Sequence, residues 1–380
     1  MSPRTRRGEP PPWKIEPINR SQFYFLLLAS FVGLGVFTFP RDLTEQDPLV
    51  MWPAFALVCA MGAVGLAASL WLLRRLPTLR VVDAYAVVMG RAGGAAAILL
   101  IGANFCLAII LVRSIGDLMH ALFLVRTPPA LIGGALAAAA VYTASAGVQV
   151  MARALPIVVT LFLLVLIVAV PLGFRTVSYP FVELPHVWDP SGTVANAAVA
   201  AYTFFGFNEV QNLRAHVAPD DGVHGRSWMA YATAVLLLAF GLFLVAGTFT
   251  PWGTTDLAWP LAAQLRLLDL PGFFIDRLGL LILGAWTTMG YACLSVHLWG
   301  QAVNVRDLLK LPPGSVAWLV PAAGGCAWAA AMFAFANHQN VYWFVHAFVD
   351  PVGIGVYVGL PLIACLVAAA RRLRTPTPAG

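Results

Sequence analysis

Charged residues inside otherwise apolar segments are the first candidates for chemistry in this sequence. Arg113, Asp117 and His120 lie at helical spacing within the apolar segment 96–124, so they fall within about 60° of one another on a helix. A charge in such a segment indicates a functional site by default, because burying it is costly. We predict that Arg113 binds a ligand and that Asp117 carries a proton or charge. The alternative is that the two opposite charges, four residues apart, neutralise each other and only pack helices.

Two further apolar segments are interrupted by glycine, at 33–35 and at 206. Glycine lets the backbone leave helical geometry, and the N–H and C=O groups that this frees need a partner. The ends of half-helices can then bind the carboxylate and the ammonium group of an amino acid. The alternative is that the glycines only allow close helix packing. The candidate ligand-binding residues around the two interruptions are Gly33, Leu34, Gly35, Phe37, Phe204, Gly206, Phe207 and Asn208.

A stripe of small and hydroxyl residues follows one face of the segment 273–301, and it includes Tyr291 and Ser295. Such a stripe can hydrogen-bond a ligand or hold helices together. We take Tyr291 as a candidate ligand contact. His297 near the end of this segment and Glu209 after the second interruption are candidates for a proton relay, while a purely structural role for His297 is the alternative.

Motifs of soluble catalysis are absent from the sequence. It contains no phosphate-binding loop of the type GxxxxGK[ST], no HExxH, no CxxC and no GxSxG, which are signatures of nucleotide-binding, metal-binding, redox and hydrolase sites. The five cysteines lie inside apolar segments without the spacing of metal ligands. We therefore expect no enzyme, no cofactor and no metal site.

The elements that carry these residues follow from composition. Of the 380 residues 60% are apolar and 11% are charged, whereas soluble domains have roughly 45–50% and about 25%. Lipid is the solvent that tolerates this excess, and a helix that crosses it needs about 20 apolar residues. The sequence predicts ten membrane spans, at 21–39, 50–73, 96–124, 129–147, 154–174, 194–213, 227–250, 273–301, 315–336 and 348–370.

The distribution of positive charge predicts the orientation of these spans. With ten spans, 17 of the 23 lysines and arginines fall on the side of the termini, five fall on the other side, and Arg113 lies within a span. Positive residues accumulate on the cytoplasmic side, so both termini are expected in the cytoplasm. The same pattern attributes the net positive charge to orientation in a lipid bilayer, and we expect no nucleic acid as a partner.

The two glycine interruptions predict an internal repeat. Each lies about 12 residues into its segment, or ~18 Å at 1.5 Å per residue, near the middle of the bilayer. Because five helices followed by five more start on opposite sides, the repeats are inverted, and matching broken helices point to a site between them. The predicted organisation is a disordered N-terminus (1–20), a first repeat (21–174), an outer loop (175–193), a second repeat (194–371) and a cytoplasmic tail (372–380).

These residues resemble the spore germination permease family, the B-subunits of spore germinant receptors, within the amino acid–polyamine–organocation (APC) transporter superfamily. The resemblance covers roughly residues 15–372. It rests on the stretch 33–41, Arg113, Arg126-Thr127-Pro128, Phe204-Phe205-Gly206, Trp259-Pro260, the stretch 270–277 and Trp286. The sequence departs from the family at one position. The family often carries a glutamate two residues after the glycine that corresponds to Gly206, but here Asn208 stands at that place and Glu209 follows it. A shift by one residue turns the carboxylate by ~100° around a helix.

The resemblance implies an all-α polytopic membrane protein with a LeuT-like, APC-type 5+5 inverted repeat in which helices 1 and 6 are broken. It also implies a spore-forming bacterium, the spore inner membrane, A- and C-type receptor subunits as partners, and a small nutrient such as an L-amino acid as ligand. The leading hypothesis is a receptor subunit that signals germination. The alternatives are a proton-coupled amino acid secondary transporter and an assembly scaffold with an inactive pocket.

Overall fold

The described part of the chain is helical almost throughout. The computed structural model describes residues 17–33, 35–77, 79–178, 189–217, 222–268 and 278–373. Within these ranges the only bridge between extended residues joins Ile18 to Val217. Apolar segments in lipid become helices because a helix pairs every backbone N–H and C=O inside the segment itself.

The first half of the chain contains five long helices and several short elements. They are α1 (Arg20–Val32), α2 (Phe39–Asp42), the 3-10 helix η1 (Pro48–Val50), α3 (Met51–Arg75), α4 (Val81–Met89), α5 (Arg91–Leu122), α6 (Pro129–Ser145), α7 (Val148–Gly173) and the 3-10 helix η2 (Phe174–Thr176).

The second half alternates long helices with more irregular pieces. They are α8 (Pro190–Val199), the 3-10 helix η4 (Ala201–Asn208), α9 (Glu209–Arg214), α10 (Val223–Thr255), α11 (Pro260–Leu265), α12 (Leu278–Leu308), the 3-10 helix η5 (Pro313–Ser315), α13 (Val316–Phe333), α14 (His338–Phe344), the π-helix η6 (Val345–Val349), α15 (Asp350–Gly353), the π-helix η7 (Ile354–Gly359) and α16 (Leu360–Ala370).

The chain is a multi-pass helical membrane protein. Among the described residues, seven helices are long and apolar enough to cross a membrane, and α6 is a shorter apolar helix. The predicted span 21–39 is divided between α1 and α2, and the predicted span 194–213 is divided among α8, η4 and α9. The count of ten spans stays a prediction.

Several boundaries differ from the expected ones, each for a local reason. α14 starts at His338, ten residues before the predicted start at 348, because the polar first turn hides the helix start and Asn337 caps it by accepting the Asn340 N–H. α10 runs through a kink at Thr250, where φ is 63°, and reaches Thr255 within the predicted loop. The same loop contains α11, and α4 lies between two predicted spans.

The predicted terminal segments are only partly described. Residues 1–16 and 374–380 lie outside the described residues, as do Leu34, most of the outer loop 175–193 and the stretch 270–277 of the family resemblance. The first helix begins at Arg20, where Asn19 and Gln22 form a capping box. Each side chain accepts from the other's backbone N–H, which fixes the start of α1.

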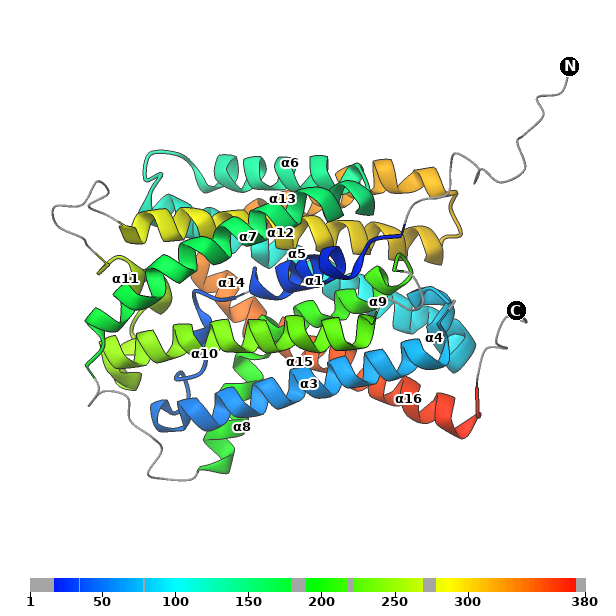
Figure 1. Cartoon of the computed structure of the whole chain (residues 1–380), viewed down its shortest axis with the longest axis horizontal. Helices are drawn as coiled ribbons and strands as arrows, with labels where there is room; N and C mark the ends of the chain where they lie inside the picture. Colours follow the sequence, from blue (N-terminus) through cyan, green and yellow to red (C-terminus); the bar gives the residue numbers. More distant parts are fainter. Residues whose placement is uncertain are drawn as a thin grey trace, which may run out of the picture.

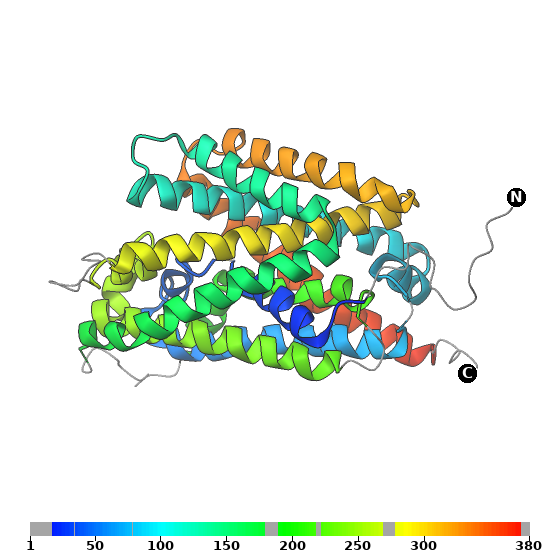
Figure 2. The same cartoon turned by 45° about the horizontal axis from the view of Figure 1, so that its top comes forward.

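The helices pack side by side around α12. Figure 1 shows the long helices running along the long axis, with α4 at one end of the bundle and α11 at the other. In the turned view of Figure 2, α12 crosses the middle, between α6 and α13 on one side and α1 on the other. In the most apolar 18-residue stretch of α12, 67% is buried inside the bundle, whereas in the corresponding stretch of α7 only 25% is buried. α12 is therefore the core helix of the bundle, and α7 presents much of its surface to lipid.

Candidate functional site

The backbone leaves helical geometry between α1 and α2. α1 ends at Val32, and Gly35 takes a positive φ of 58° before α2 starts at Phe39. A Cβ on Gly35 would lie 2.6 Å from Oγ1 of Thr203 and from the ring of Tyr202. Both the dihedral angle and the close approach thus require glycine at this position.

The turn at Gly35 is held by its own carbonyl group. The Gly35 oxygen accepts the N–H of Thr38 at 3.0 Å and the N–H of Phe39 at 2.9 Å, and the Thr38 hydroxyl oxygen lies 3.1 Å from it. The Val36 N–H has no acceptor among the described residues. The N–H groups of Gly35 and Phe37 likewise have no acceptor among the described residues, so the turn leaves several backbone donors unpaired within that part of the chain.

A cavity lies against this interruption. The space inside it that water can occupy is about 30 Å³, so a ligand larger than water requires its walls to move apart. Three elements line it, namely the turn between α1 and α2, one face of α5, and Trp259 at the start of α11. The lining residues are Gly33, Gly35, Val36, Phe37, Thr38, Ile110, Leu111, Ser114, Ile115, Leu118 and Trp259.

The chemistry of this cavity is mostly apolar with a few polar groups. Ser114 and Thr38 supply hydroxyl groups, and the interrupted backbone supplies amide and carbonyl groups. Phe37 packs with its ring centroid 5.3 Å from that of Trp286. An apolar slot with a small number of placed polar groups is the usual form of a small-molecule site.

Gly206, where a second interruption was predicted, lies within the 3-10 helix η4 and packs directly on α1. The Ser30 hydroxyl of α1 donates to the carbonyl of Gly206 at 2.9 Å. A Cβ on Gly206 would lie 2.0 Å from the backbone carbonyl oxygen of Ser30. On α12, Cys293 lies against Gly33, where an added Cβ would lie 2.2 Å from the Cys293 Cβ. The glycines here serve close packing between three helices, which is the alternative stated above for these motifs.

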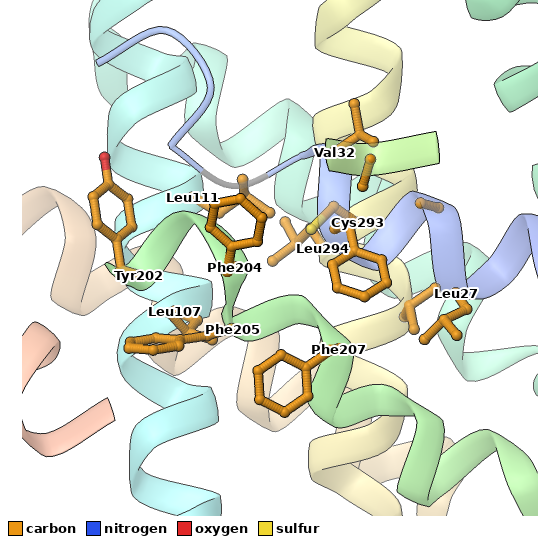
Figure 3. Packing of buried hydrophobic residues seen from close by; sticks show 14 of the residues in the cluster. Leu27, Val32, Leu107, Leu111, Tyr202, Phe204, Phe205, Phe207, Cys293 and Leu294 are labelled. Atoms are coloured by element: carbon orange, nitrogen blue, oxygen red, sulfur yellow. The ribbon is translucent and has the colours of Figure 1, made fainter. Parts of the chain in front are cut away.

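The aromatic residues around Gly206 belong to the core. Figure 3 shows the rings of Phe204, Phe205 and Phe207 projecting from the short helix between α8 and α9. Phe204 is 2% exposed and Phe207 is fully buried. Neither lines the cavity.

The predicted ligand residues therefore separate into two groups. Gly33, Gly35 and Phe37 line the cavity, while Leu34 lies outside the described residues. Asn208 donates to Asn104 at 3.4 Å, and the Tyr291 hydroxyl pairs with Thr143 at 2.6 Å. These two polar side chains, with Phe204, Gly206 and Phe207, lie outside the cavity lining.

Arg113 is engaged by protein groups. Its Nε lies 2.8 Å from Asp117, and its Nη1 donates to the carbonyl oxygens of Ala331 and Phe335, both at 3.1 Å. His338 lies 3.4 Å from the same Asp117 carboxylate. The arginine thus joins α5 to the end of α13, which corresponds to the neutralised packing pair, and it does not line the cavity.

The predicted relay residues Glu209 and His297 lie together. His297 Nδ1 is 3.1 Å from Glu209 Oε1, and the side chains are 1% and 0% exposed. Asn212 donates to the other oxygen of Glu209 at 2.9 Å. Asp117 is held by Arg113 in a separate cluster.

Sequence reasoning missed several cavity residues. Trp259 lines the cavity from α11, and Ser114 lines it from the same helix as Arg113. Ser114 is the neighbour of a singled-out arginine, so its position was a usable signal. Within the described residues no group of three or more His, Cys, Asp or Glu side chains is placed to hold a metal ion.

Comparisons with known proteins agree with this architecture. A family model described as "Spore germination protein" matches residues 17–339. The chain is 22% identical over 306 residues to spore germination protein B2 of Bacillus subtilis (strain 168), covering 79% of this chain and 82% of that protein. It is 20% identical over 200 residues to spore germination protein A2 of the same organism, covering 52% and 54% of the two chains.

The fold itself matches a solved structure. The crystal structure of MhsT in complex with L-phenylalanine superposes with a TM-score of 0.67 at 13% identity, covering 94% of this chain and 99% of that one. The expected LeuT-like fold is thereby confirmed.

Proposed function

We propose a receptor function for this chain, which belongs to the spore germination protein family, the family expected from its sequence. Its fold is that of LeuT-like transporters. The proposed role is that of the membrane subunit of a spore germinant receptor, which recognises a small nutrient inside the membrane domain and signals germination. No enzymatic activity is part of this role.

The observation that carries the proposal is the cavity at the interrupted first helix. It combines an apolar wall on α5, the hydroxyl groups of Ser114 and Thr38, and backbone N–H groups at the Gly35 turn that have no acceptor among the described residues. An L-amino acid fits this chemistry, because backbone amides at a helix interruption bind a carboxylate and the apolar wall receives a side chain. The structural neighbour MhsT was solved with L-phenylalanine, which supports the same ligand class.

Binding would act by shifting a conformational equilibrium. A ligand that enters this small cavity stabilises a widened state in which the turn at Gly35, α5 and α11 surround it, by its differential affinity for that state. The partners proposed to detect this shift are A- and C-type receptor subunits. The proposed location is the spore inner membrane with both termini in the cytoplasm, which the predicted charge distribution supports.

Ligand-induced thermal shift of the purified protein tests the proposal, with each proteinogenic L-amino acid as probe. Ser114→Leu puts extra carbons into the cavity, and Gly102→Leu is the control, because nothing lies within 4 Å of a Cβ at that position on the same helix. We expect at least one amino acid to raise the Tm of the wild type and of Gly102→Leu, and to lose that effect in Ser114→Leu. An undiminished shift in Ser114→Leu, or no shift in the wild type with any probe, would contradict the proposal.

Substitutions of the glycines at the interruptions make poorer tests. A side chain at Gly33 or Gly206 would enter Cys293 or the Ser30 backbone, so a lost response would report misfolding. Ser114 avoids this difficulty because its side chain already faces the cavity.

The second candidate function is a proton-coupled amino acid secondary transporter. The buried pair of Glu209 and His297 favours it, because an acid and an imidazole 3.1 Å apart can exchange a proton inside the membrane. Uptake of labelled amino acids into proteoliposomes distinguishes the two functions. Accumulation driven by a pH gradient, without partner subunits, supports the transporter, and ligand binding without accumulation supports the receptor.

A further inference from the structure

A cluster of three titratable side chains is buried beside the cavity. His346 Nδ1 lies 2.9 Å from Asp350 Oδ2, and His346 Nε2 lies 3.7 Å from Asp42 Oδ1. Asp42 is fully buried and Asp350 is 2% exposed. The imidazole thus stands between two carboxyl groups that come from opposite ends of the chain.

Irregular helix geometry aims these groups at one another. His346 lies in the π-helix η6, and Asp350 follows it with its N–H bonded to the carbonyl of Val345. Asp42 ends the four-residue helix α2, directly after the interruption at Gly35. π-helical turns are rare and frequently occur at functional sites, because the extra residue per turn redirects side chains.

The two carboxyl groups differ in their hydrogen-bond donors. Asp350 accepts the Tyr202 N–H at 2.9 Å on one oxygen and faces His346 with the other. Among the described residues, Asp42 accepts a long hydrogen bond from the Tyr202 hydroxyl, at 3.3 Å on Oδ2, while its Oδ1 has no partner. Burying an ionised carboxylate that has one long hydrogen bond, as Asp42 would, costs free energy. A buried carboxylate that accepts two N–H hydrogen bonds, as Asp350 can, is stabilised.

A single proton accounts for two buried atoms that lack hydrogen-bond partners. His346 Nε2 is likewise buried without a hydrogen-bond partner, and it faces the unpaired oxygen of Asp42. The two atoms are 3.7 Å apart, which is beyond a direct hydrogen bond, but one proton on Asp42 removes the opposition of two bare acceptors. Without it, two acceptors face each other in a site shielded from water, which is unfavourable.

The surrounding charges do not remove the need for that proton. Arg41 places its guanidinium over the ring of Tyr342, 4.3 Å from the centroid, and among the described residues it forms no ion pair with Asp42. The Tyr342 hydroxyl donates to Glu45, a further acid near the cluster. If Asp42, Asp350 and Glu45 were all ionised, the single positive charge of Arg41 would leave the region with excess negative charge.

We propose that Asp42, His346 and Asp350 form a proton-binding site, in which Asp42 is a carboxylic acid whose protonated oxygen faces Nε2 of His346 while Asp350 remains ionised. A proton fits better than a metal ion, because no described group of His, Cys, Asp or Glu side chains is placed to surround one. Deprotonation releases the proton from Asp42 to water, so no other reactant is involved.

This site is linked to the cavity by two hydrogen bonds. The Thr38 hydroxyl, on the cavity wall, pairs with the Tyr202 hydroxyl, which donates to Asp42. Whatever displaces Thr38 therefore changes the donor available to Asp42 and with it the cost of losing the proton. The proton site stands independently of the identity of the cavity's ligand.

Infrared difference spectroscopy of the purified full-length protein tests the site, because a carboxylic acid has a C=O stretching band that a carboxylate lacks. The variants are Asp42→Asn and, as a matched control, Asp83→Asn, whose carboxyl group is exposed on α4. We expect the wild type to show an acid band at neutral pH that Asp42→Asn abolishes and Asp83→Asn leaves intact. Absence of a band assigned to Asp42 at neutral pH would overturn the proposal.

Two further measurements keep the proposal testable if Asp42→Asn folds poorly. Tyr202→Phe removes the donor to the ionised form of Asp42, so the band should survive to higher pH by roughly one unit or more. An unchanged titration in Tyr202→Phe would contradict the assignment. Loss of the wild-type band on adding sodium at constant pH would replace the proton by a sodium ion and overturn it as well.

Discussion

The carboxylate of Glu209 lies 3.1 Å from Nδ1 of His297, with both side chains shielded from solvent. Glu209 begins α9 directly after the irregular helix η4, and His297 lies on the core helix α12. The pair therefore ties the second interrupted segment to the centre of the bundle. Because both groups are buried, each depends on the other for compensation of its charge or its hydrogen-bonding capacity.

Removal of the histidine alone should destabilise the fold strongly. His297→Leu leaves the Glu209 carboxylate buried with only Asn212 as donor, and breaking a buried pair from one side costs about 3–5 kcal/mol. The double variant His297→Leu with Glu209→Gln should recover part of that loss, since no charge is left behind. Thermal unfolding in detergent measures both, and a double variant no more stable than His297→Leu would show that the pair is not coupled.

Gly35→Ala should be more damaging than Gly90→Ala. Both residues have positive φ, 58° and 62°, but a Cβ at Gly90 meets nothing within 4 Å, whereas one at Gly35 meets Thr203 and Tyr202. Gly90→Ala should cost about 1–3 kcal/mol of backbone strain, because Gly90 has φ 62° and ψ −127°, and Gly35→Ala should cost more because of the clash. Comparing the two values of Tm isolates the contribution of packing, and equal values would argue against the close approach at Gly35.

Arg113 should act on stability through Asp117 and the carbonyl groups at the end of α13. Arg113→Met leaves the Asp117 carboxylate with His338 as its nearby charge partner, so we expect a loss of about 3 kcal/mol or more. The double variant Arg113→Met with Asp117→Asn should regain part of this unfolding free energy. A double-mutant cycle on unfolding free energies gives the coupling, and a coupling near zero would contradict the ion pair.

Stability should fall as the pH is lowered, partly through His216. Burial, with the positive charges of Arg80 and Arg306, lowers the pKa of His216 to about 4 from 6.5. The unfolded chain therefore binds more protons between these values, so the contribution of His216 is fully present above pH 6.5 and is lost towards pH 4. At pH 5 the loss amounts to about 2 kcal/mol.

The variant that checks this contribution is His216→Asn, which cannot be protonated in this range. The backbone carbonyl of His216 accepts the Ile18 N–H at 2.9 Å and is retained, although the ring contact with Trp299 is lost. We expect the drop in Tm between pH 7 and pH 5 to be smaller in His216→Asn than in the wild type. An equal drop would assign the pH dependence to other groups.

The sequence by itself determined the class of the molecule. Long apolar segments with few charges specify membrane helices because lipid offers the backbone no hydrogen-bond partners. Gly35 marked the turn between α1 and α2 because a missing Cβ is a local property that a reader can see in the chain, whereas Gly206 lies in the 3-10 helix η4 and the break predicted there stays a prediction. The same locality explains why the pairing of Arg113 with Asp117, four residues apart, was already among the alternatives.

The tertiary structure decided which of these residues share a site. It placed Gly33 and Gly35 on a cavity with Ser114 and Trp259, and it left Asn208 and Tyr291 outside that lining. It also brought Asp42 to His346 across most of the length of the chain. Such contacts depend on how helices rotate and shift against one another, and that is set by packing between surfaces far apart in sequence, which no local pattern of residues encodes.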